Sequence, residues 1–289
     1  MGVTVGIVGS VNLDLVASGA PLPRAGETVT GARFAQHPGG KGANQAMAAK
    51  RLGAEVAMVG CVGDDALAEP ALALLREDGV DLSGVMSEIG EATGVALIAV
   101  SPEGENQISV ASGANLRVGP NDVAALPKCD VILCQLEVPV AAVEAAAKAA
   151  SETGALFAIN LAPAMEIPSS LMRSADILIV NEVEAAFYGD ALHERGGMTA
   201  LTLGGAGAVL YKLGQEIARV PAFDVTVIDT TGAGDTFCGA LAVALAEGQT
   251  PEAALRFASA AGALAVTRPG AQPSLPSRAQ VEALLAATL

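Results

Sequence analysis

The chain has 289 residues, of which 52% are hydrophobic and 16% charged, so it carries enough apolar side chain for a large buried core. Its formal net charge is −15, which argues against nucleic acid or an anionic membrane as a partner, because the summed field repels polyphosphate. A small phosphorylated ligand is still compatible with this charge, since a local anion hole and a bound cation can hold it.

Targeting and redox signals favour a cytoplasmic protein. The first basic residue is Arg24, so the N-terminus lacks the positive region of a secretory signal, and no uninterrupted apolar stretch is long enough to span a bilayer. The two histidines, His37 and His193, argue against a histidine metal site or a Ser-His-Asp triad. Four cysteines lie in apolar surroundings without Cys-x-x-Cys spacing, which predicts buried free thiols: Cys61, Cys129, Cys134 and Cys238.

Short apolar runs alternate with helical segments along most of the chain. The runs predict strands buried on both faces of a sheet, at residues 4–10, 55–63, 130–135, 155–160 and 176–180. Helices are predicted at residues 42–52, 64–78, 139–151, 234–247, 251–267 and 277–287. This order predicts an α/β fold, a doubly wound and mostly parallel sheet flanked by helices, in one domain over residues 1–289.

Two segments interrupt this alternation and predict a small antiparallel β lid. Residues 15–37 alternate in strand fashion without a helix, and residues 93–111 form two strand-like runs joined by a polar Pro-Glu-Gly-Glu turn. Such an insertion can cover a cleft, or it can be an edge extension through which two copies pair. We expect both roles here, with a homodimer formed through the lid.

Polar residues follow the predicted strands where open α/β sheets place their ligands. Asn12 and Asp14 are expected at the carboxyl end of the first strand and on one side of the chain, where they can divide the hydroxyls of a polyol. An Asx turn is the alternative for this pair. Glu137 follows another buried strand in the same way.

A glycine-rich stretch leads into a helix at residues 37–53. Gly39, Gly40 and Gly42 surround Lys41, and Asn44 lies in the first helical turn. The spacing fits neither a Walker A loop nor a dinucleotide fingerprint, but glycines at a helix entrance let a ligand approach the backbone. A plain helix-initiating turn is the alternative.

Two further motifs have both a structural and a functional interpretation. Asn181 and Glu184 are one helical turn apart, which suits either Mg²⁺ held through its waters or a helix cap. Residues 201–212 predict a strand, a glycine turn and a second strand, which either contact a nucleotide or form a simple hairpin.

The stretch IDTTGAGDTFCGA, residues 228–240, joins an apolar run to an alanine-rich helix. Its glycines and Asp235 suit an ordinary helix start, since an acidic residue complements the helix dipole. The same residues also suit an anion hole of backbone N–H groups beside a proton-accepting carboxylate. Taken alone, the stretch does not decide between them.

The order of these motifs is more specific than any one of them. Asn-x-Asp, Gly-Glu-Thr-Val, Gly-Gly-Lys-Gly-Ala-Asn, Asn-x-x-Glu, Thr-Leu-Gly and Asp-Thr-Thr-Gly-Ala-Gly-Asp-Thr-Phe follow one another along nearly the whole chain. In this order the chain resembles the ribokinase-like (PfkB) sugar-kinase family, most specifically at residues 26–46, 228–240 and 265–276. The resemblance implies phosphorylation of D-ribose at its 5-hydroxyl by MgATP.

The resemblance also assigns roles to individual residues. It implies that Asp235 is the catalytic base, beside an anion hole formed by Thr231, Gly232, Ala233 and Gly234. Sugar-contacting positions are Asn12, Asp14, Gly40, Lys41, Asn44 and Glu137, together with Asp235. Nucleotide-contacting positions are Asn181 and Glu184, which are also linked indirectly to Mg²⁺, and Thr202, Gly204, Gly207 and Ser259. A K⁺ site is implied at Asp229, Thr231, Ala265, Arg268, Gly270 and Ser274, several through backbone carbonyls.

One departure and three alternatives accompany this resemblance. Residues 185–200 are shorter than the helical insert usual in the family, which leaves the preferred phosphoryl donor open. A PfkB-type kinase for another substrate, such as a fructose-type sugar, deoxyribose or a nucleoside, shares the fold, although few aromatic side chains are present to stack on a base. A non-catalytic sugar-binding protein on the same scaffold is the second alternative. An NAD-dependent oxidoreductase is set aside, because Gly-x-Gly-x-x-Gly does not follow the first strand.

Overall fold

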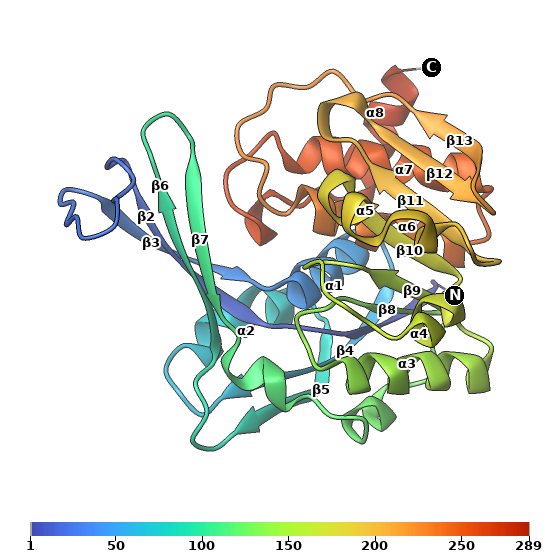
Figure 1. The fold of residues 1–289 in the computed structure, drawn as a ribbon, viewed down its shortest axis with the longest axis horizontal. Helices are drawn as coiled ribbons and strands as arrows, with labels where there is room; N and C mark the ends of the chain where they lie inside the picture. The colour runs from blue at the N-terminus through green and yellow to red at the C-terminus, as the bar shows by residue number, and fades with distance from the viewer. Residues whose placement is uncertain (1, 289) are drawn as a thin grey trace.

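A nine-stranded sheet forms the centre of the molecule in the computed structural model, which describes residues 2–288 (Figure 1). In spatial order its strands are β13 (Gln215–Val220), β12 (Ala208–Lys212), β11 (Met198–Thr202), β10 (Ile177–Asn181), β9 (Leu156–Asn160), β8 (Val131–Cys134), β1 (Thr4–Val8), β4 (Glu55–Gly63) and β5 (Asp81–Glu88). Neighbours from β11 to β5 are parallel, and only β12 and β13 are antiparallel to their neighbours. The predicted doubly wound, mostly parallel sheet is confirmed.

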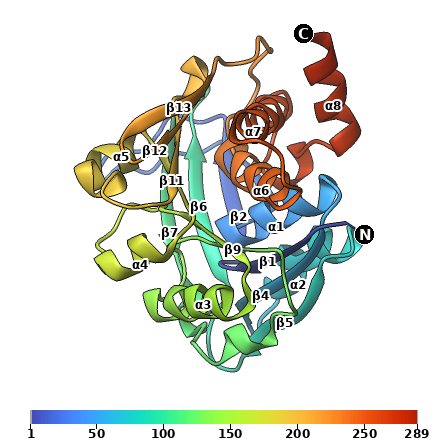
Figure 2. The ribbon, with the colours of Figure 1, turned by 90° about the vertical axis from the view of Figure 1, so that its right-hand side faces the viewer.

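Helices cover both faces of this sheet (Figure 2). One face packs against α1 (Lys41–Arg51), α2 (Ala68–Glu77), α6 (Ala233–Ala246), α7 (Pro251–Ala265) and α8 (Arg278–Ala287). The opposite face packs against α3 (Val140–Thr153), α4 (Ser169–Ser174) and α5 (Glu182–Tyr188). The strands are therefore buried on both sides, which is why their sequences are continuously apolar rather than alternating.

Helix α6 is buried along most of its length, and this fixes the position of its N-terminus. Every residue from Asp235 to Ala244 is buried, because α6 packs against α1, α7 and the central sheet. A helix that is apolar on all sides belongs in a core. Asp235 is the only charged residue of α6, so it enters the protein interior with the first turn.

A second sheet of four strands stands away from the body of the molecule (Figure 1). Its order is β3 (Arg33–Gly39), β2 (Asn12–Ser18), β6 (Gly94–Val100) and β7 (Asn106–Ala111). Both edge pairs are antiparallel, but the central pair of β2 and β6 is parallel. Residues 19–93, which include β3 and the first part of the α/β body, separate these two strands in the chain. The lid is thus a mixed sheet with antiparallel edges.

The connection between β2 and β3 differs from the prediction. Residues 26–32 alternate in sequence like a strand, but they belong to an exposed loop without sheet partners. A turn closes there through the hydrogen bond from the Glu27 N–H to the Arg24 carbonyl. Alternation without a neighbouring strand does not make a sheet, so the strand predicted over these residues is wrong.

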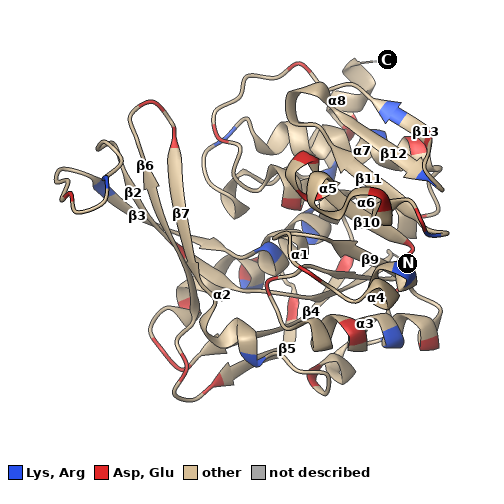
Figure 3. Ribbon diagram, viewed as in Figure 1, with Lys and Arg blue, Asp and Glu red and all other residues tan. Residues whose placement is uncertain are grey.

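Charge and cysteine placement agree with the sequence. Acidic residues are spread over the ribbon, including the turn between β6 and β7, while Lys and Arg are sparser (Figure 3). The four cysteines, all within the described residues, are buried and free. Among residues 2–288, no helix combines the length and apolar character needed to cross a membrane.

Candidate active site

Asp235 lies at the meeting point of two helix N-termini. Helix α6 begins after Gly232, which adopts a left-handed conformation with φ of 78°, and Asp235 follows three residues later with 9% of its surface exposed. Asn44 Nδ2 donates a hydrogen bond of 2.9 Å to one carboxylate oxygen of Asp235, and Gln45 Nε2 donates one of 3.0 Å to the other. Both donors belong to α1, so the carboxylate is fixed from outside its own helix.

The electrostatics of Asp235 suit a proton acceptor. Burial raises the pKa of Asp235, and the charge of Lys41 and the amide hydrogen bonds lower it only in part. A carboxylate with a raised pKa holds a proton more strongly than an exposed one, which makes it a better general base. The net direction is upward, as a base near neutral pH requires.

Asn12 and Asp14 lie beside this carboxylate, at the start of a strand of the second sheet. The first strand ends at Val8, and the chain passes through residues 9–11 into β2, which belongs to the second sheet. Asn12 and Asp14 therefore lie beyond the carboxyl end of β1 as buried residues on one face at the start of β2, and the alternative of an Asx turn is not observed there. Asn12 accepts a hydrogen bond of 2.8 Å from Asn115 Nδ2.

Asp14 is electrostatically coupled to the site. Desolvation raises its pKa to about 7, and the nearby charges of Glu137 and Asp235 add to the increase. Three carboxylates from three distant parts of the chain therefore share one region. Such crowding of like charge is typical of functional sites rather than of a packed core.

The glycine-rich turn before α1 brings its backbone close to β2. Gly40 has φ of 88°, and a Cβ at this position would lie 2.7 Å from the backbone nitrogen of Asn12. Only glycine combines this conformation with this close approach. Glu137 Oε2 anchors the same turn by accepting hydrogen bonds from the Lys41 N–H (3.1 Å) and Ser10 Oγ (2.5 Å).

Lys41 supplies the positive charge of the cluster. Burial acts to lower its pKa, but the carboxylates of Asp235, Glu137 and Glu184 outweigh burial and raise it. Lys41 is therefore a fixed cation among acidic groups. The structure thus brings together all the residues that the sequence assigned to the sugar, namely Asn12, Asp14, Gly40, Lys41, Asn44, Glu137 and Asp235.

Asn181 and Glu184 form a helix cap at the start of α5. Asn181 Oδ1 accepts from the Glu184 N–H at 2.9 Å, and Glu184 Oε2 accepts from the Asn181 N–H at 2.8 Å. This reciprocal pair is a capping box, the structural alternative for the motif. Burial raises the pKa of Glu184, whose charge also acts on Lys41, so the capped pair faces the acidic cluster. A carboxylate and an amide oxygen are donors that fit Mg²⁺ held through its waters.

The glycine turn at residues 203–207 joins β11 and β12 in an antiparallel hairpin, as one of its two interpretations predicts. Thr202 ends β11, where its Oγ1 donates a hydrogen bond of 3.4 Å to the Val180 carbonyl, and Gly204 and Gly207 flank the turn. Ser259 lies on α7, where its hydroxyl is buried and has no hydrogen-bond partner within residues 2–288. No hydrogen bond joins Ser259 to the hairpin in this part of the chain.

Asp229 ties the loop before α6 to the loop after α7. One carboxylate oxygen accepts from the N–H and Oγ1 of Thr231, at 2.9 and 2.6 Å, and the other accepts from the Gly270 N–H at 2.8 Å. Burial acts to raise the pKa of Asp229, but these hydrogen bonds outweigh it and lower the pKa. The ends of the second loop are also held, with Ala265 buried in α7 and Ser274 Oγ donating to the Ala271 carbonyl at 2.8 Å.

The hydrogen bonds of the loop before α6 leave only some of its backbone N–H groups available as anion-hole donors. Thr231 gives its N–H to Asp229, and the Ala233 N–H lies 3.3 Å from the Thr230 carbonyl. Within residues 2–288, the N–H groups of Gly232, Gly234 and Asp235 have no hydrogen-bond partner. These three groups at the start of α6 are the ones free to receive an anion.

Four polar residues of the site were missed by the sequence reasoning. Ser10 and Gln45 contact Glu137 and Asp235, while Gln135 and Asn160 lie behind Gln45. Their position in the sequence could have indicated Gln135 and Asn160. Both end apolar strand runs and so lie, like Glu137, at the carboxyl ends of parallel strands.

The comparisons with known proteins agree with this geometry. Residues 4–278 match the pfkB family of carbohydrate kinases, and the chain belongs to that family. It is therefore a phosphotransferase by class, and nothing in its fold departs from that class.

Its characterised relatives narrow the class further. The chain is 41% identical to the ribokinase of Bacillus subtilis (strain 168) over 289 residues, covering 96% of this chain and 98% of the relative. It is 37% identical to the ribokinase of Haemophilus influenzae over 294 residues, covering 95% and 96%. The solved structure of Arabidopsis thaliana ribokinase complexed with ribose and ATP superposes with a TM-score of 0.90 at 34% identity, covering 99% of both chains.

Proposed function

We propose that this protein phosphorylates D-ribose at its 5-hydroxyl with ATP, using Asp235 as the general base. The observation that carries the proposal is the buried carboxylate of Asp235, held by Asn44 and Gln45 at the start of α6. It has a raised pKa and lies within the cluster of sugar-assigned residues. The similarity to ribokinases over nearly the whole chain supports ribose as the acceptor.

The proposed mechanism follows from the hydrogen-bonding groups that surround Asp235. Asn12, Asp14 and Glu137 bind the sugar hydroxyls and hold the 5-hydroxyl against Asp235, which takes its proton. The oxygen attacks the γ-phosphorus of ATP, the bond from that phosphorus to the bridging oxygen of the β-phosphate breaks, and ADP leaves. The N–H groups of Gly232, Gly234 and Asp235 stabilise the charge on the transferring phosphoryl group. Phosphoryl transfer depends mainly on such positioning and charge stabilisation.

ATP is the donor in this proposal, and Asn181 and Glu184 are the residues that would hold Mg²⁺ through its waters. When bound, Mg²⁺ would supply positive charge against the phosphates. Thr202, Gly204, Gly207 and Ser259 complete the nucleotide side. The similarity to a ribokinase complexed with ribose and ATP covers 99% of both chains, which supports ATP as the donor although residues 185–200 are short for the family.

A monovalent cation fits the loops that Asp229 joins. The donors are oxygen atoms, as K⁺ requires: the carboxylate of Asp229, Thr231, Ser274, and backbone carbonyls of Ala265, Arg268 and Gly270. A cation there would order the turn that presents the anion-hole N–H groups. The loops fit such a site because Asp229 already holds residues 229–231 against residue 270.

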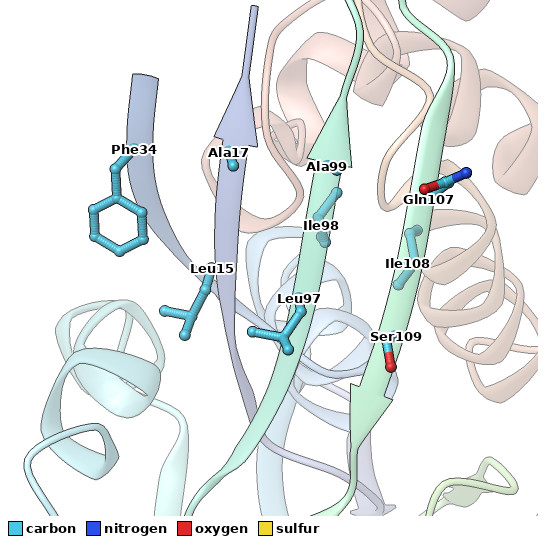
Figure 4. A pocket seen from close by; sticks show the side chains of 9 residues that line it. All are labelled: Leu15, Ala17, Phe34, Leu97, Ile98, Ala99, Gln107, Ile108 and Ser109. Atoms are coloured by element: carbon cyan, nitrogen blue, oxygen red, sulfur yellow. The ribbon is translucent and has the colours of Figure 1, made fainter. Parts of the chain in front are cut away.

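The second sheet carries an apolar outer face that suits a homodimer (Figure 4). Side chains alternate along a strand, so this face points away from Asn12 and Asp14. It is an open depression of about 510 Å³ with Phe34 68% exposed and Leu97 52% exposed. Its members, which we call the outer face, are Leu15, Ala17, Phe34, Leu97 and Ala99. Exposed apolar patches of this kind mark protein contacts, and a second copy would cover it.

The direct test of the proposed function is ATP-dependent phosphorylation of a sugar panel. Ribose, fructose, deoxyribose and adenosine are compared with and without K⁺, and the product is identified by mass and by the position of the phosphate. We expect ribose 5-phosphate to form fastest and K⁺ to increase the rate. Preference for another acceptor would transfer the proposal to that substrate, and no turnover with any of them would favour a binding protein.

The buried free thiols are compatible with the reducing cytoplasm.

A further inference from the structure

A chain of buried amides leads from β8 to the carboxylate of Asp235. Gln135 Nε2 donates a hydrogen bond of 2.6 Å to Gln45 Oε1, and Gln45 Nε2 donates to Asp235 Oδ1 at 3.0 Å and to Asn160 Oδ1 at 3.2 Å. Asn160 Nδ2 in turn donates to the Ile179 carbonyl at 3.2 Å. Gln45 and Gln135 have no exposed surface, so bulk solvent does not reach these groups.

The direction of this chain is set at both of its ends. An ionised carboxylate only accepts, so Gln45 must turn its Nε2 toward Asp235 and its Oε1 away. Oε1 then needs a donor in a region closed to bulk solvent, and Gln135 supplies it. If Gln45 turned over, its oxygen would face the carboxylate, and only protonated Asp235 could bond to it. The orientation of Gln45 is therefore linked to the protonation state of the base.

Gln135 is held for this task by the backbone around it. It directly follows β8, and its Oε1 lies against Gly9, where a Cβ would collide with that oxygen. Gln135 Oε1 itself has no hydrogen-bond partner within residues 2–288. Burying an amide with one unsatisfied atom costs free energy, so the hydrogen bond made by its other polar atom, Nε2, must offset that cost. Gln135 Nε2 donates to Gln45 alone.

We propose that Gln135 is a positioning residue that fixes the Gln45 amide as a donor to Asp235 and so keeps the base ready to accept a proton. Gln135 acts through Gln45 and has no exposed surface of its own. The inference rests on the proposed role of Asp235 as the base. It concerns how the base is maintained, and not which substrate is used.

The test compares Gln135→Met with the wild type over a range of pH. The apolar replacement removes the donor to Gln45 Oε1 and leaves that oxygen unpaired. This weakens the bias toward the donating orientation, which Asn160 then supports alone, and so favours protonated Asp235. We expect kcat at pH 7 to fall about 10- to 100-fold and the acidic limb of the kcat profile to move up by about one pH unit. The KM values for ribose and ATP should change little, and kcat should approach the wild-type value at high pH.

Gln135→Glu retains a polar group of the same size and should change the basic limb of the pH profile instead of the acidic one. While protonated, the new carboxyl donates to Gln45 as the amide did, so the acidic limb should stay in place. Once ionised, it attracts the Gln45 amide nitrogen away from Asp235, so kcat should fall on the basic side. A structural role alone would not produce limbs that move in opposite ways. If Gln135→Met does not fold, the kinetics of Gln135→Glu still test the proposal.

Thr199→Val is the matched control. Thr199 is 2% exposed, and its Oγ1 donates to the Leu192 carbonyl at 2.9 Å, so its replacement also removes a buried hydrogen bond. It has no bond to the amide chain, and its pH profile should match the wild type. Gln45→Met and the double variant complete the set, since a residue that acts only through Gln45 adds no further loss to Gln45→Met.

The outcomes separate this inference from the proposed function. An unchanged pH profile in folded Gln135 variants, or additive losses in the double variant, would overturn the positioning role. If Asp235→Asn is inactive at the same time, the base assignment stands and only the amide chain fails. If Asp235→Asn keeps its turnover, the proposed function itself fails.

Discussion

Asn44 and Asp235 are 191 positions apart in the chain and are joined by a hydrogen bond of 2.9 Å. The bond connects α1, which follows directly from the second sheet, to α6, which is buried in the α/β body. In the proposed function, one contact therefore links the segment assigned to the sugar to the carboxylate assigned as the base. Geometry of this kind fixes the substrate relative to the base before the reaction begins.

Asp14→Asn tests the pKa of about 7 for Asp14 through ribose binding. Only the ionised carboxylate is a full acceptor for sugar hydroxyls, so in the wild type kcat/KM for ribose should fall as the pH decreases through 7. Asp14→Asn should raise the KM for ribose by roughly 10-fold or more, since a hydrogen bond to a charged group is lost, and should remove this pH dependence. Steady-state kinetics between pH 5.5 and 9 measure both effects. An Asn variant with wild-type KM would contradict the role of Asp14.

The same variant should be more stable than the wild type at high pH. Asp14 ionises near 3.8 in the unfolded chain and near 7 in the folded protein, so folding is favoured below 3.8 and this advantage is lost as the pH rises to 7. Asp14→Asn removes the cost, and the gain should be about 2–4 kcal/mol at pH 8 and should vanish near pH 4. Denaturant unfolding at the two pH values measures it. An equal effect at both pH values would show that the carboxyl is not perturbed.

Asp229→Asn should weaken the response to K⁺. The amide can keep the bonds from Thr231, but its nitrogen would face the Gly270 N–H, so the two loops would separate. We expect the K⁺ concentration for half-activation to rise about 10-fold, with the KM for ribose unchanged. Titration of activity with K⁺ at constant ionic strength measures the change. Arg268→Ala is the control, because it keeps the backbone carbonyl, and equal losses in both variants would argue against a cation at Asp229.

Leu97→Glu should dissociate the dimer that we propose to form through the outer face. The substitution puts a charge at the centre of the outer face, where association would bury it without a partner. Light scattering or analytical ultracentrifugation should give a dimer for the wild type and a monomer for the variant. Ile217→Glu, which changes an isoleucine 44% exposed on β13, should leave the dimer intact. A wild-type monomer, or a dimer that survives Leu97→Glu, would exclude this interface.

The central fold could be predicted from the sequence because its strands have a distinctive composition. β1, β8 and β10 are buried on both faces and appear as continuous apolar runs. β5 and β13 lie at the two edges of the sheet, where exposed polar residues interrupt the pattern, and neither was predicted. Edge strands lack the burial that makes the others recognisable.

The candidate site could be predicted only in part. Asp235, Lys41 and Asn44 are in short motifs whose order along the chain resembles that of a known family. Gln45 and Gln135 are in no glycine-rich turn, and their role depends on a contact between residues 90 positions apart. Nothing local in the sequence shows such a contact, which arises because α1 packs on the sheet that contains β8.

Asp235→Asn is the measurement that tests the central claim most directly. The amide keeps the size of the side chain but cannot accept the proton of the 5-hydroxyl, so single-turnover phosphorylation of ribose should fall by at least about 10²-fold. ATP binding measured by calorimetry should remain within a few-fold of the wild type, since the nucleotide side is unchanged. A variant that binds ATP but no longer transfers the phosphoryl group would support Asp235 as the base. Near-full transfer by Asp235→Asn would contradict it.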